Sequence, residues 1–320
     1  MGALDGRVVI ITGAGRGIGR EHALLMASEG AKIVVNDLGG NSDGTGSDAG
    51  PAQEVVDEIK AMGGQAVANT DSVTSWEGGQ RMVNAAVEAF GDLHVLVNNA
   101  GILRDRVLVN MTEEEWDAVM AVHLKGHFVP SRWAAAYWRE KSKETGGPVK
   151  ASIVNTASGA MLGNGGQTNY TAAKAGIAAA TLVMAQELSR YGVRANCLAP
   201  VARTRLTLQT PGLGDVVAAP DDPGQFDKFD PANVSPLVAY LATADCPFTG
   251  GVFHVGGNEV GLYGGWSLSE DKILAADGRW TVDGLQKLAP RLLEGRGELS
   301  SVITAIGDTF RNFGKRTPTT

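Results

Sequence analysis

Short runs of β-branched and other apolar residues alternate along the chain with longer amphipathic stretches. The runs are apolar at nearly every position, which is typical of strands in a parallel sheet covered on both faces. Seven runs predict strands, at Val8–Thr12, Lys32–Asn36, Gln65–Asn69, Leu93–Asn98, Ser152–Thr156, Val193–Leu198 and Val252–Val255. Strands separated by helices imply right-handed crossovers, so we expect an α/β fold with a doubly wound, mainly parallel seven-stranded sheet.

The stretches between these runs carry apolar residues at helical spacing. Two such stripes are formed by Val55, Ile59 and Met62 and by Val83, Val87 and Phe90. Thr112 followed by Glu115 has the spacing of a capping box, which predicts the start of a long helix through Trp116, Val119 and Met120.

Three segments do not fit the alternation. Gly39–Pro51 is rich in Gly, Ser and Asp and predicts a flexible loop insertion. Thr204–Pro231 has no clean period, and it is either a substrate lid or a solvated excursion. From Gly264 onward the pattern predicts a helical extension with an apolar stripe, formed by Leu285, Leu288, Leu292 and Leu293. We therefore expect one domain over residues 1–262 and an extension over 263–320 that packs on this domain or on a partner subunit.

Composition narrows the class of protein. The chain has 320 residues, 43% of them hydrophobic, and a net charge of -7, which suits one large α/β domain. No basic stripe indicates nucleic acid, no apolar run reaches membrane-spanning length, and no signal peptide opens the chain, so we expect a cytoplasmic protein. Cys197 and Cys246 lack a metal-ligand spacing, which argues against a metal site and against a disulfide framework.

A glycine-rich turn joins the first predicted strand to the helix after it. The segment Thr12–Gly19 reads TGAGRGIG, and Gly13, Gly17 and Gly19 would let the backbone approach a pyrophosphate closely. The helix N-terminus then offers free N–H groups and the positive end of its dipole. The turn therefore predicts a dinucleotide site.

Asp37, at the end of the second predicted strand, indicates which dinucleotide binds. A carboxylate there can accept hydrogen bonds from the adenosine ribose hydroxyls and would repel the additional phosphate of NADP. Arg16 points the other way, because a basic residue within the turn can pair with that phosphate. We weight Asp37 more and expect NAD as the cofactor.

A candidate catalytic group follows the fifth predicted strand. Tyr170 and Lys174 are four residues apart on a predicted helix, so both project from one face. The lysine ammonium is expected to depress the pKa of the phenol, which could then accept the proton of an alcohol. Ser158 lies at the carboxyl edge of the sheet and can hydrogen-bond the substrate oxygen.

Together these motifs resemble the short-chain dehydrogenase/reductase family over roughly residues 5–260, with the segment Asn98–Gly101 matching its NNAG motif. The resemblance implies a Rossmann fold, with Asn98 and its successors on the adenosine side of the cofactor, Asp71 at the adenine, and Lys174 also at the nicotinamide ribose. The cofactor site that it implies comprises Gly13, Gly15, Arg16, Gly17, Ile18, Gly19, Asp37, Asp71, Ser72, Val73, Asn99, Ala100, Gly101, Tyr170, Lys174, Pro200 and Thr204.

A narrower likeness is carried by NDLGG at Asn36–Gly40, NNAGILRDR at Asn98–Arg106, VHLKGHF at Val122–Phe128 and GNGGQTNYTAAKAG at Gly163–Gly176. These segments resemble the (3R)-hydroxyacyl-CoA dehydrogenase modules of peroxisomal multifunctional enzymes of type 2, also called 17β-hydroxysteroid dehydrogenase type 4. His123 stands where the wider family has an Asn that relays protons, and the resemblance implies that it is a substitute in the catalytic group. Ser158 precedes Tyr170 by one position fewer than is usual, and Val201 replaces the usual glycine.

The likeness implies an NAD-dependent oxidoreductase that oxidises 3-hydroxyacyl-CoA thioesters in β-oxidation. Alternatives within this class are a steroid or steroid side-chain hydroxyacyl-CoA dehydrogenase and a 3-oxoacyl reductase, and a non-catalytic dinucleotide-binding sensor is an alternative of another class. Members of the family usually form dimers or tetramers, so we expect a homodimer or homotetramer.

Overall fold

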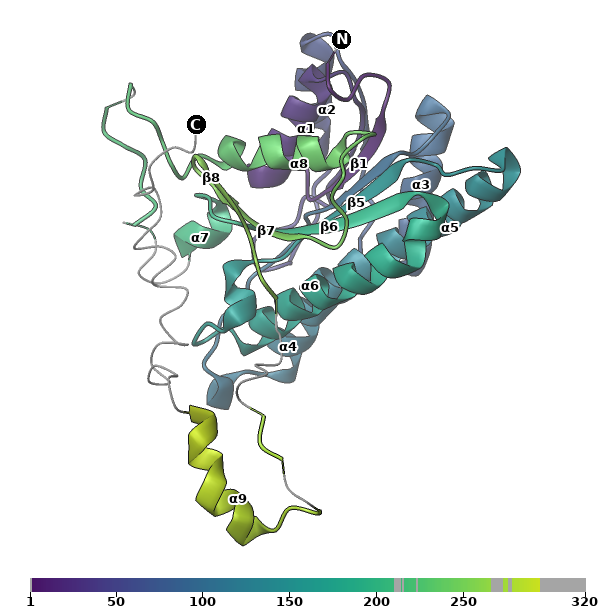
Figure 1. Cartoon of the computed structure of the whole chain (residues 1–320). Coiled ribbons are helices and arrows are strands. Elements are labelled where there is room, and N and C mark those ends of the chain that lie inside the picture. Colours follow the sequence, from purple (N-terminus) through teal and green to yellow (C-terminus); the bar gives the residue numbers. More distant parts are fainter. Residues whose placement is uncertain are drawn as a thin grey trace.

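The computed structural model describes residues 2–209, 214, 216–222, 224–265, 273–275 and 278–293. A single sheet crosses the molecule with helices on both faces (Figure 1). Its strand order is β3-β2-β1-β4-β5-β6-β7-β8, and all neighbours are parallel except β7 and β8. The strands are β1 Val8–Thr12, β2 Lys32–Asn36, β3 Gln65–Asn69, β4 Val95–Asn98, β5 Ala151–Thr156, β6 Val193–Pro200, β7 Val252–Gly256 and β8 Glu259–Leu262.

The two faces of the sheet are covered by different helices. One face packs against α1, α2 and α8, and the other against α3, α5 and α6. Each layer buries aliphatic side chains against the central strands, which are fully buried along their length. The helices are α1 Gly17–Ser28, α2 Gly50–Ala61, α3 Trp76–Phe90, α4 Glu113–Met120, α5 Gly126–Thr145, α6 Thr168–Leu188, α7 Arg205–Gln209, α8 Ser235–Ala242 and α9 Val282–Leu288.

The predicted doubly wound fold is confirmed, with one strand more than expected. The eighth strand, β8, returns antiparallel to β7 through a tight turn, with Gly256 paired to Glu259. The residues of β8 alternate between half-buried and exposed. Glu259 and Gly261 occupy two of its four positions, so the run lacks the continuous apolar pattern of the inner strands. An edge strand is hydrogen-bonded on one side only, which tolerates such a sequence.

The predicted capping box is present at the start of α4, where Thr112 and Glu115 bond each other's backbone N–H groups. The helix continues past Met120 through one turn of π-helix, at Ala121–Lys125, into α5. π-Turns within helices are frequent at functional sites, and this one carries His123.

In the described part of the chain, the segments predicted to be irregular are mainly loops, but Thr204–Pro231 also contains the short helix α7. The Gly39–Pro51 loop ends at α2, and it is docked rather than free, because Leu103 N donates to Ser42 O and Arg104 Nε donates to Asp43 O. In the Thr204–Pro231 segment, Val217 and Phe229 pack against Val201. Leu285, Leu288 and Leu292 are exposed around α9, whereas the Leu293 side chain lies outside the described residues.

Candidate active site

A cavity of about 330 Å³ opens at the carboxyl edge of the sheet. Its walls come from the loops after β1, β2, β4, β5 and β6 and from the start of α6, the position at which open α/β sheets bind ligands. The structure brings seventeen of the residues predicted for the site to this wall, and it leaves out Gly15, Gly19 and Asn98. The residues are Gly13, Arg16, Gly17, Ile18, Asp37, Asp71, Ser72, Val73, Asn99, Ala100, Gly101, His123, Ser158, Tyr170, Lys174, Pro200 and Thr204.

Gly15 and Gly19 do not line the cavity, but they allow the glycine turn to pack closely against its neighbours. A β-carbon on Gly19 would lie 2.2 Å from Gly13 O, and one on Gly15 would lie 2.9 Å from an Asp37 carboxylate oxygen. Gly13 and Gly17 have φ values of 64° and 55°, which L side chains rarely adopt. The close packing explains why small residues recur in this turn.

The N-terminus of α1 fits an anionic group. No side chain caps it, and its first turn contains no acidic residue. Its backbone N–H groups and the positive end of the helix dipole are therefore available at the cavity wall formed by Gly17 and Ile18. This is the arrangement that a dinucleotide pyrophosphate requires.

Asp37 lies at the cavity wall beside the glycine turn. Its two carboxylate oxygens accept hydrogen bonds from Gly15 N at 2.8 Å and Gly39 N at 2.7 Å, which hold the carboxylate across the glycine turn. Two guanidinium groups share this region: the pKa of Arg205 is lowered by burial and by the nearby charge of Arg16, and Asp37 opposes that shift. The site thus presents one fixed negative charge flanked by two positive ones.

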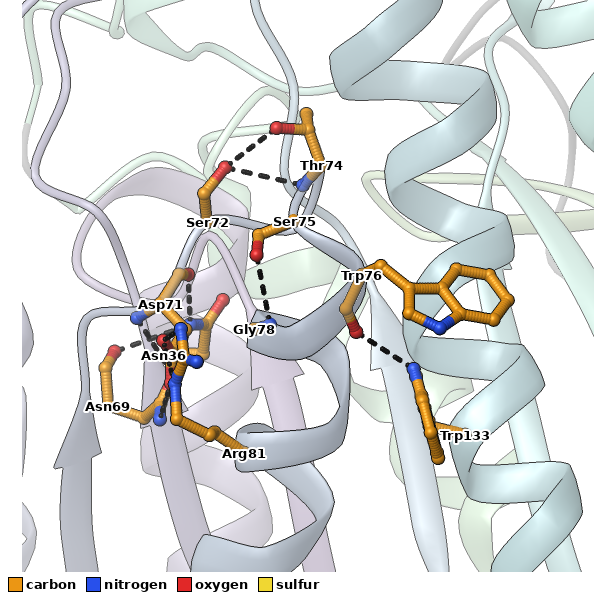
Figure 2. A network of polar contacts seen from close by, with 10 residues as sticks. All are labelled: Asn36, Asn69, Asp71, Ser72, Thr74, Ser75, Trp76, Gly78, Arg81 and Trp133. Atoms are coloured by element: carbon orange, nitrogen blue, oxygen red, sulfur yellow. Dashed lines mark hydrogen bonds and ion pairs between the residues drawn. The ribbon is translucent and has the colours of Figure 1, made fainter.

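Figure 2 shows the polar network around Asp71, which also lines the cavity. Arg81 Nε donates to Asp71 Oδ1 at 2.8 Å, and Asn69 Nδ2 donates to Asp71 Oδ2 at 2.9 Å. Asn36 Nδ2 completes the network by donating to Asn69 Oδ1 and to Asp71 O. The network therefore fixes the Asp71 carboxylate at the cavity wall, and its predicted contact with the adenine stays a prediction.

One residue of the NNAG motif faces away from the cavity. Asn98 is fully buried, and its Nδ2 donates to Ser131 Oγ at 2.8 Å and to Asn155 Oδ1 at 2.9 Å. The expectation that Asn98 lines the adenosine side is wrong, because its position within β4 turns its side chain toward α5 and β5. Asn99 lines the cavity instead, and its Nδ2 donates to Gly13 O at 3.1 Å, which ties this segment to the glycine turn.

Ser158, Tyr170 and Lys174 come together at the opposite end of the cavity. Lys174 Nζ donates to Thr156 O at 2.6 Å and lies 5.4 Å from the centre of the Tyr170 ring. A hydrogen bond links the Ser158 and Tyr170 side chains and by itself lowers the pKa of the phenol. The three groups can therefore hold one substrate oxygen between a hydroxyl and a phenol.

The expected depression of the Tyr170 pKa is not found. Burial raises the pKa of Tyr170 to about 12, with Asp105 contributing in the same direction, and burial lowers the pKa of Lys174 to about 7. Both shifts have one main cause: burial removes water from each group, which disfavours its charged form. The phenol is protonated at neutral pH.

His123 lies edge-on to Tyr170, with 5.1 Å between the centres of the two rings. Its Nε2 is 2.7 Å from Ile102 O, and its Nδ1 is buried without a hydrogen-bond partner among the described residues. Burial and the charge of Lys174 hold the pKa of His123 well below its usual range, so the ring is neutral. Its predicted part in catalysis stays a prediction.

Several residues of the site were not anticipated from the sequence. Gln167 lines the cavity, and its Nε2 donates at 2.7 Å to Asp105, whose carboxyl pKa is raised by burial. His254 and Tyr263 line the substrate side, and they come from β7 and from the residue after β8. The NNAGILRDR segment contained Asp105, but no sequence signal pointed to Tyr263, because β8 was not predicted.

No group of three His, Cys, Asp or Glu side chains suited to a metal ion occurs in the part of the chain that the structure describes. Cys197 and Cys246 are both free thiols, and both are buried. Among the described helices, none is long and apolar enough to cross a membrane.

Comparison with known proteins agrees with this geometry. The model of the short chain dehydrogenase family matches residues 7–209. A hydroxyacyl-CoA dehydrogenase of Mycobacterium tuberculosis, ChsB1, is 47% identical over 81% of this chain and 80% of its own length. Peroxisomal multifunctional enzyme type 2 of Mus musculus is 41% identical over 80% of this chain, which spans about a third (32%) of that enzyme.

A solved structure described as a short chain dehydrogenase from Mycobacterium avium has the same fold. Its TM-score is 0.80 at 48% identity, and the match covers 92% of this chain and 96% of that one. The family model, the relatives and the shared fold agree with a cavity that joins the glycine turn to the Ser158, Tyr170 and Lys174 group. The chain belongs to the short chain dehydrogenase family and is an oxidoreductase enzyme.

Proposed function

We propose that this enzyme oxidises 3-hydroxyacyl-CoA thioesters to 3-oxoacyl-CoA with NAD as the hydride acceptor. The observation that carries the proposal is the single cavity that joins a pyrophosphate-type glycine turn to Ser158, Tyr170 and Lys174. The choice of substrate is supported by two relatives whose names specify hydroxyacyl-CoA or a peroxisomal multifunctional enzyme.

The residues of the site divide the work. The N-terminus of α1 binds the pyrophosphate, Asp37 the adenosine ribose and Asp71 the adenine, which leaves the nicotinamide end facing Tyr170. When bound, NAD supplies the hydride acceptor. Ser158 and Tyr170 hold the hydroxyl of the substrate. For the oxidation, Tyr170 first gives its own proton to solvent, and its phenolate oxygen then takes the hydroxyl proton of the substrate as the hydride leaves the same carbon. Lys174 stabilises negative charge on the phenol oxygen when its own amine is protonated.

The preference for NAD over NADP rests on Asp37. Its carboxylate is fixed by two backbone N–H groups at the place where a ribose hydroxyl binds, so an added phosphate would meet a negative charge. Arg16 and Arg205 reduce this repulsion without removing it, because they flank the carboxylate and do not replace it.

The test of the function is Tyr170→Phe, assayed by NADH absorbance with (3R)-3-hydroxybutyryl-CoA. We expect turnover to fall by about 10²- to 10⁴-fold, the usual contribution of a positioned acid–base group, while NAD binding measured by calorimetry is retained. Tyr240→Phe is the matched control, since Tyr240 is exposed on α8 and does not line the cavity. Retained turnover in Tyr170→Phe, or a wild-type enzyme inactive on the thioester, would contradict the proposal.

We also propose an oligomeric state and a cellular location for the enzyme. Leu285, Leu288 and Leu292 are exposed at α9 and suit a subunit contact in a homodimer or homotetramer. Sedimentation of the full chain tests this, and a monomer would contradict it. We place the enzyme in the cytoplasm and assign residues 263–320 to an extension of the main domain.

A further inference from the structure

The substrate side of the cavity contains a phenol that the catalytic group does not use. Tyr263 follows β8, and its backbone N–H donates to Val252 O at 2.8 Å, so the antiparallel edge strand fixes where this side chain leaves the sheet. The ring packs against the small buried cluster that includes Met161 and Ile177, and it lies edge-on to His254, with 6.5 Å between ring centres. Tyr263 and His254 both line the cavity.

The hydroxyl of Tyr263 lies close to the catalytic serine. A β-carbon built on Gly159 would be 3.9 Å from Tyr263 Oη, and Gly159 directly follows Ser158. Apart from Gly159 and its two chain neighbours, no other atom comes within 4 Å of that β-carbon position. Ser158 and Tyr263 both line the cavity, so one ligand there can reach both side chains.

The chemistry of this phenol is that of a hydrogen-bond donor. Burial raises the pKa of Tyr263 above its usual value, so the hydroxyl keeps its proton throughout the neutral range. Among the described residues, no hydrogen bond of this hydroxyl is found, and it faces the cavity. A half-buried donor of this kind is satisfied by water or by an acceptor on a bound ligand.

A 3-hydroxyacyl thioester carries two oxygens, on carbons separated by a single methylene. The catalytic serine and tyrosine hold the hydroxyl oxygen, so the carbonyl oxygen lies a short distance along the chain from them. We propose that Tyr263 Oη donates a hydrogen bond to the thioester carbonyl and thereby selects 3-hydroxyacyl thioesters over secondary alcohols that lack this carbonyl. The assignment rests on the proposed function, and it makes Tyr263 a specificity-determining residue.

Two ligands that differ only at the carbonyl test the contact. (3R)-3-Hydroxybutyryl-CoA carries it, and S-(3-hydroxybutyl)-CoA, its thioether analogue, has a methylene in its place. Dissociation constants for both are measured by calorimetry on wild type, Tyr263→Phe and the control Tyr240→Phe, whose phenol is exposed on α8. We expect Tyr263→Phe to weaken binding of the thioester by roughly 3- to 10-fold, the worth of one neutral hydrogen bond, and to leave the thioether unchanged.

The possible outcomes separate this inference from the proposed function. If Tyr263→Phe binds both ligands as wild type does, or weakens both equally, Tyr263 does not recognise the carbonyl and the inference is wrong although the function stands. If the wild-type enzyme neither binds nor oxidises the thioester, the proposed function fails and the inference fails with it. If the KM of Tyr263→Phe for the thioester rises while its kcat is retained, the kinetics support the inference in the same way as the binding data.

Discussion

Replacing Asp37 by asparagine removes one charge from the adenosine end of the cavity and changes almost nothing in volume. In the wild-type chain the carboxylate accepts from Gly15 N and Gly39 N. An asparagine has one acceptor oxygen, so one of the two backbone donors loses its partner. That loss affects NAD and NADP alike, and the ratio of their specificity constants therefore isolates the effect of the charge.

The size of the charge effect follows from Coulomb's law. Two unit charges about 4 Å apart repel by about 1 kcal/mol in water and about 4 kcal/mol at the effective dielectric of a protein surface. Asp37 is half-buried, which places it between these limits. Removing it relieves NADP of this repulsion, and Arg16 and Arg205 remain to pair with the phosphate. For NAD, a neutral acceptor replaces a charged one at the ribose, which costs about 1 kcal/mol.

We therefore expect Asp37→Asn to lower the ratio of kcat/KM for NAD over NADP by at least roughly tenfold. The assay measures initial rates at the NADH and NADPH absorbance band with one alcohol substrate and varied cofactor. Asp43→Asn is the control, because Asp43 lies on the loop that follows Asp37, is half-buried like Asp37 and does not line the cavity. A ratio that stays at the wild-type value in Asp37→Asn would refute the argument that this carboxylate excludes the phosphate.

The remaining predictions concern stability. Lys174 has a folded-state pKa of about 7 against about 10.4 unfolded, so between these values the unfolded chain binds more protons and stability rises with pH. The free energy of unfolding of Lys174→Met, measured with urea, should exceed that of wild type by up to about 5 kcal/mol at pH 7 or below. This difference should disappear toward about pH 10. A pH-independent gap would show that the ammonium is not buried. Gly19→Ala should lower the melting temperature by several degrees through its 2.2 Å contact with a turn carbonyl, whereas Gly147→Ala, in open space, should not.

The inner sheet was predictable because its strands are buried on both faces. Burial on both faces requires apolar residues at nearly every position, and the sequence shows them as continuous apolar runs. All seven predicted strands lie in the sheet, although the fourth begins at Val95 and the sixth extends to Pro200. The capping box of α4 was predictable for a similar reason, since two side chains at fixed spacing satisfy each other locally. Where one local rule determines the structure, the sequence displays it.

The missed features depend on contacts between distant segments. The strand β8 is stabilised by pairing with β7 and not by its own composition, so Tyr263 could not be placed at the cavity. Gln167 meets Asp105 because a bridge joins Arg106 to the start of α6 across a long stretch of sequence. The direction of the Asn98 side chain depended on the pleat of β4, and a shift of one residue along a strand reverses the face.

The phenol of Tyr170 shows most clearly where reasoning from residue types stops. The sequence supplied a lysine one helical turn away, and Coulomb attraction alone predicts a depressed phenol pKa. The fold supplies full burial of both groups, and desolvation acts against each charge, so the pKa of the phenol rises to about 12 and that of the amine falls to about 7. At neutral pH the Tyr170 phenol and the His123 imidazole are therefore neutral, whereas the Lys174 amine is close to the midpoint of its titration. Under the proposed mechanism, charge on the phenol is stabilised when the amine is protonated at the same moment, and catalysis depends on that coupled charge in the transition state.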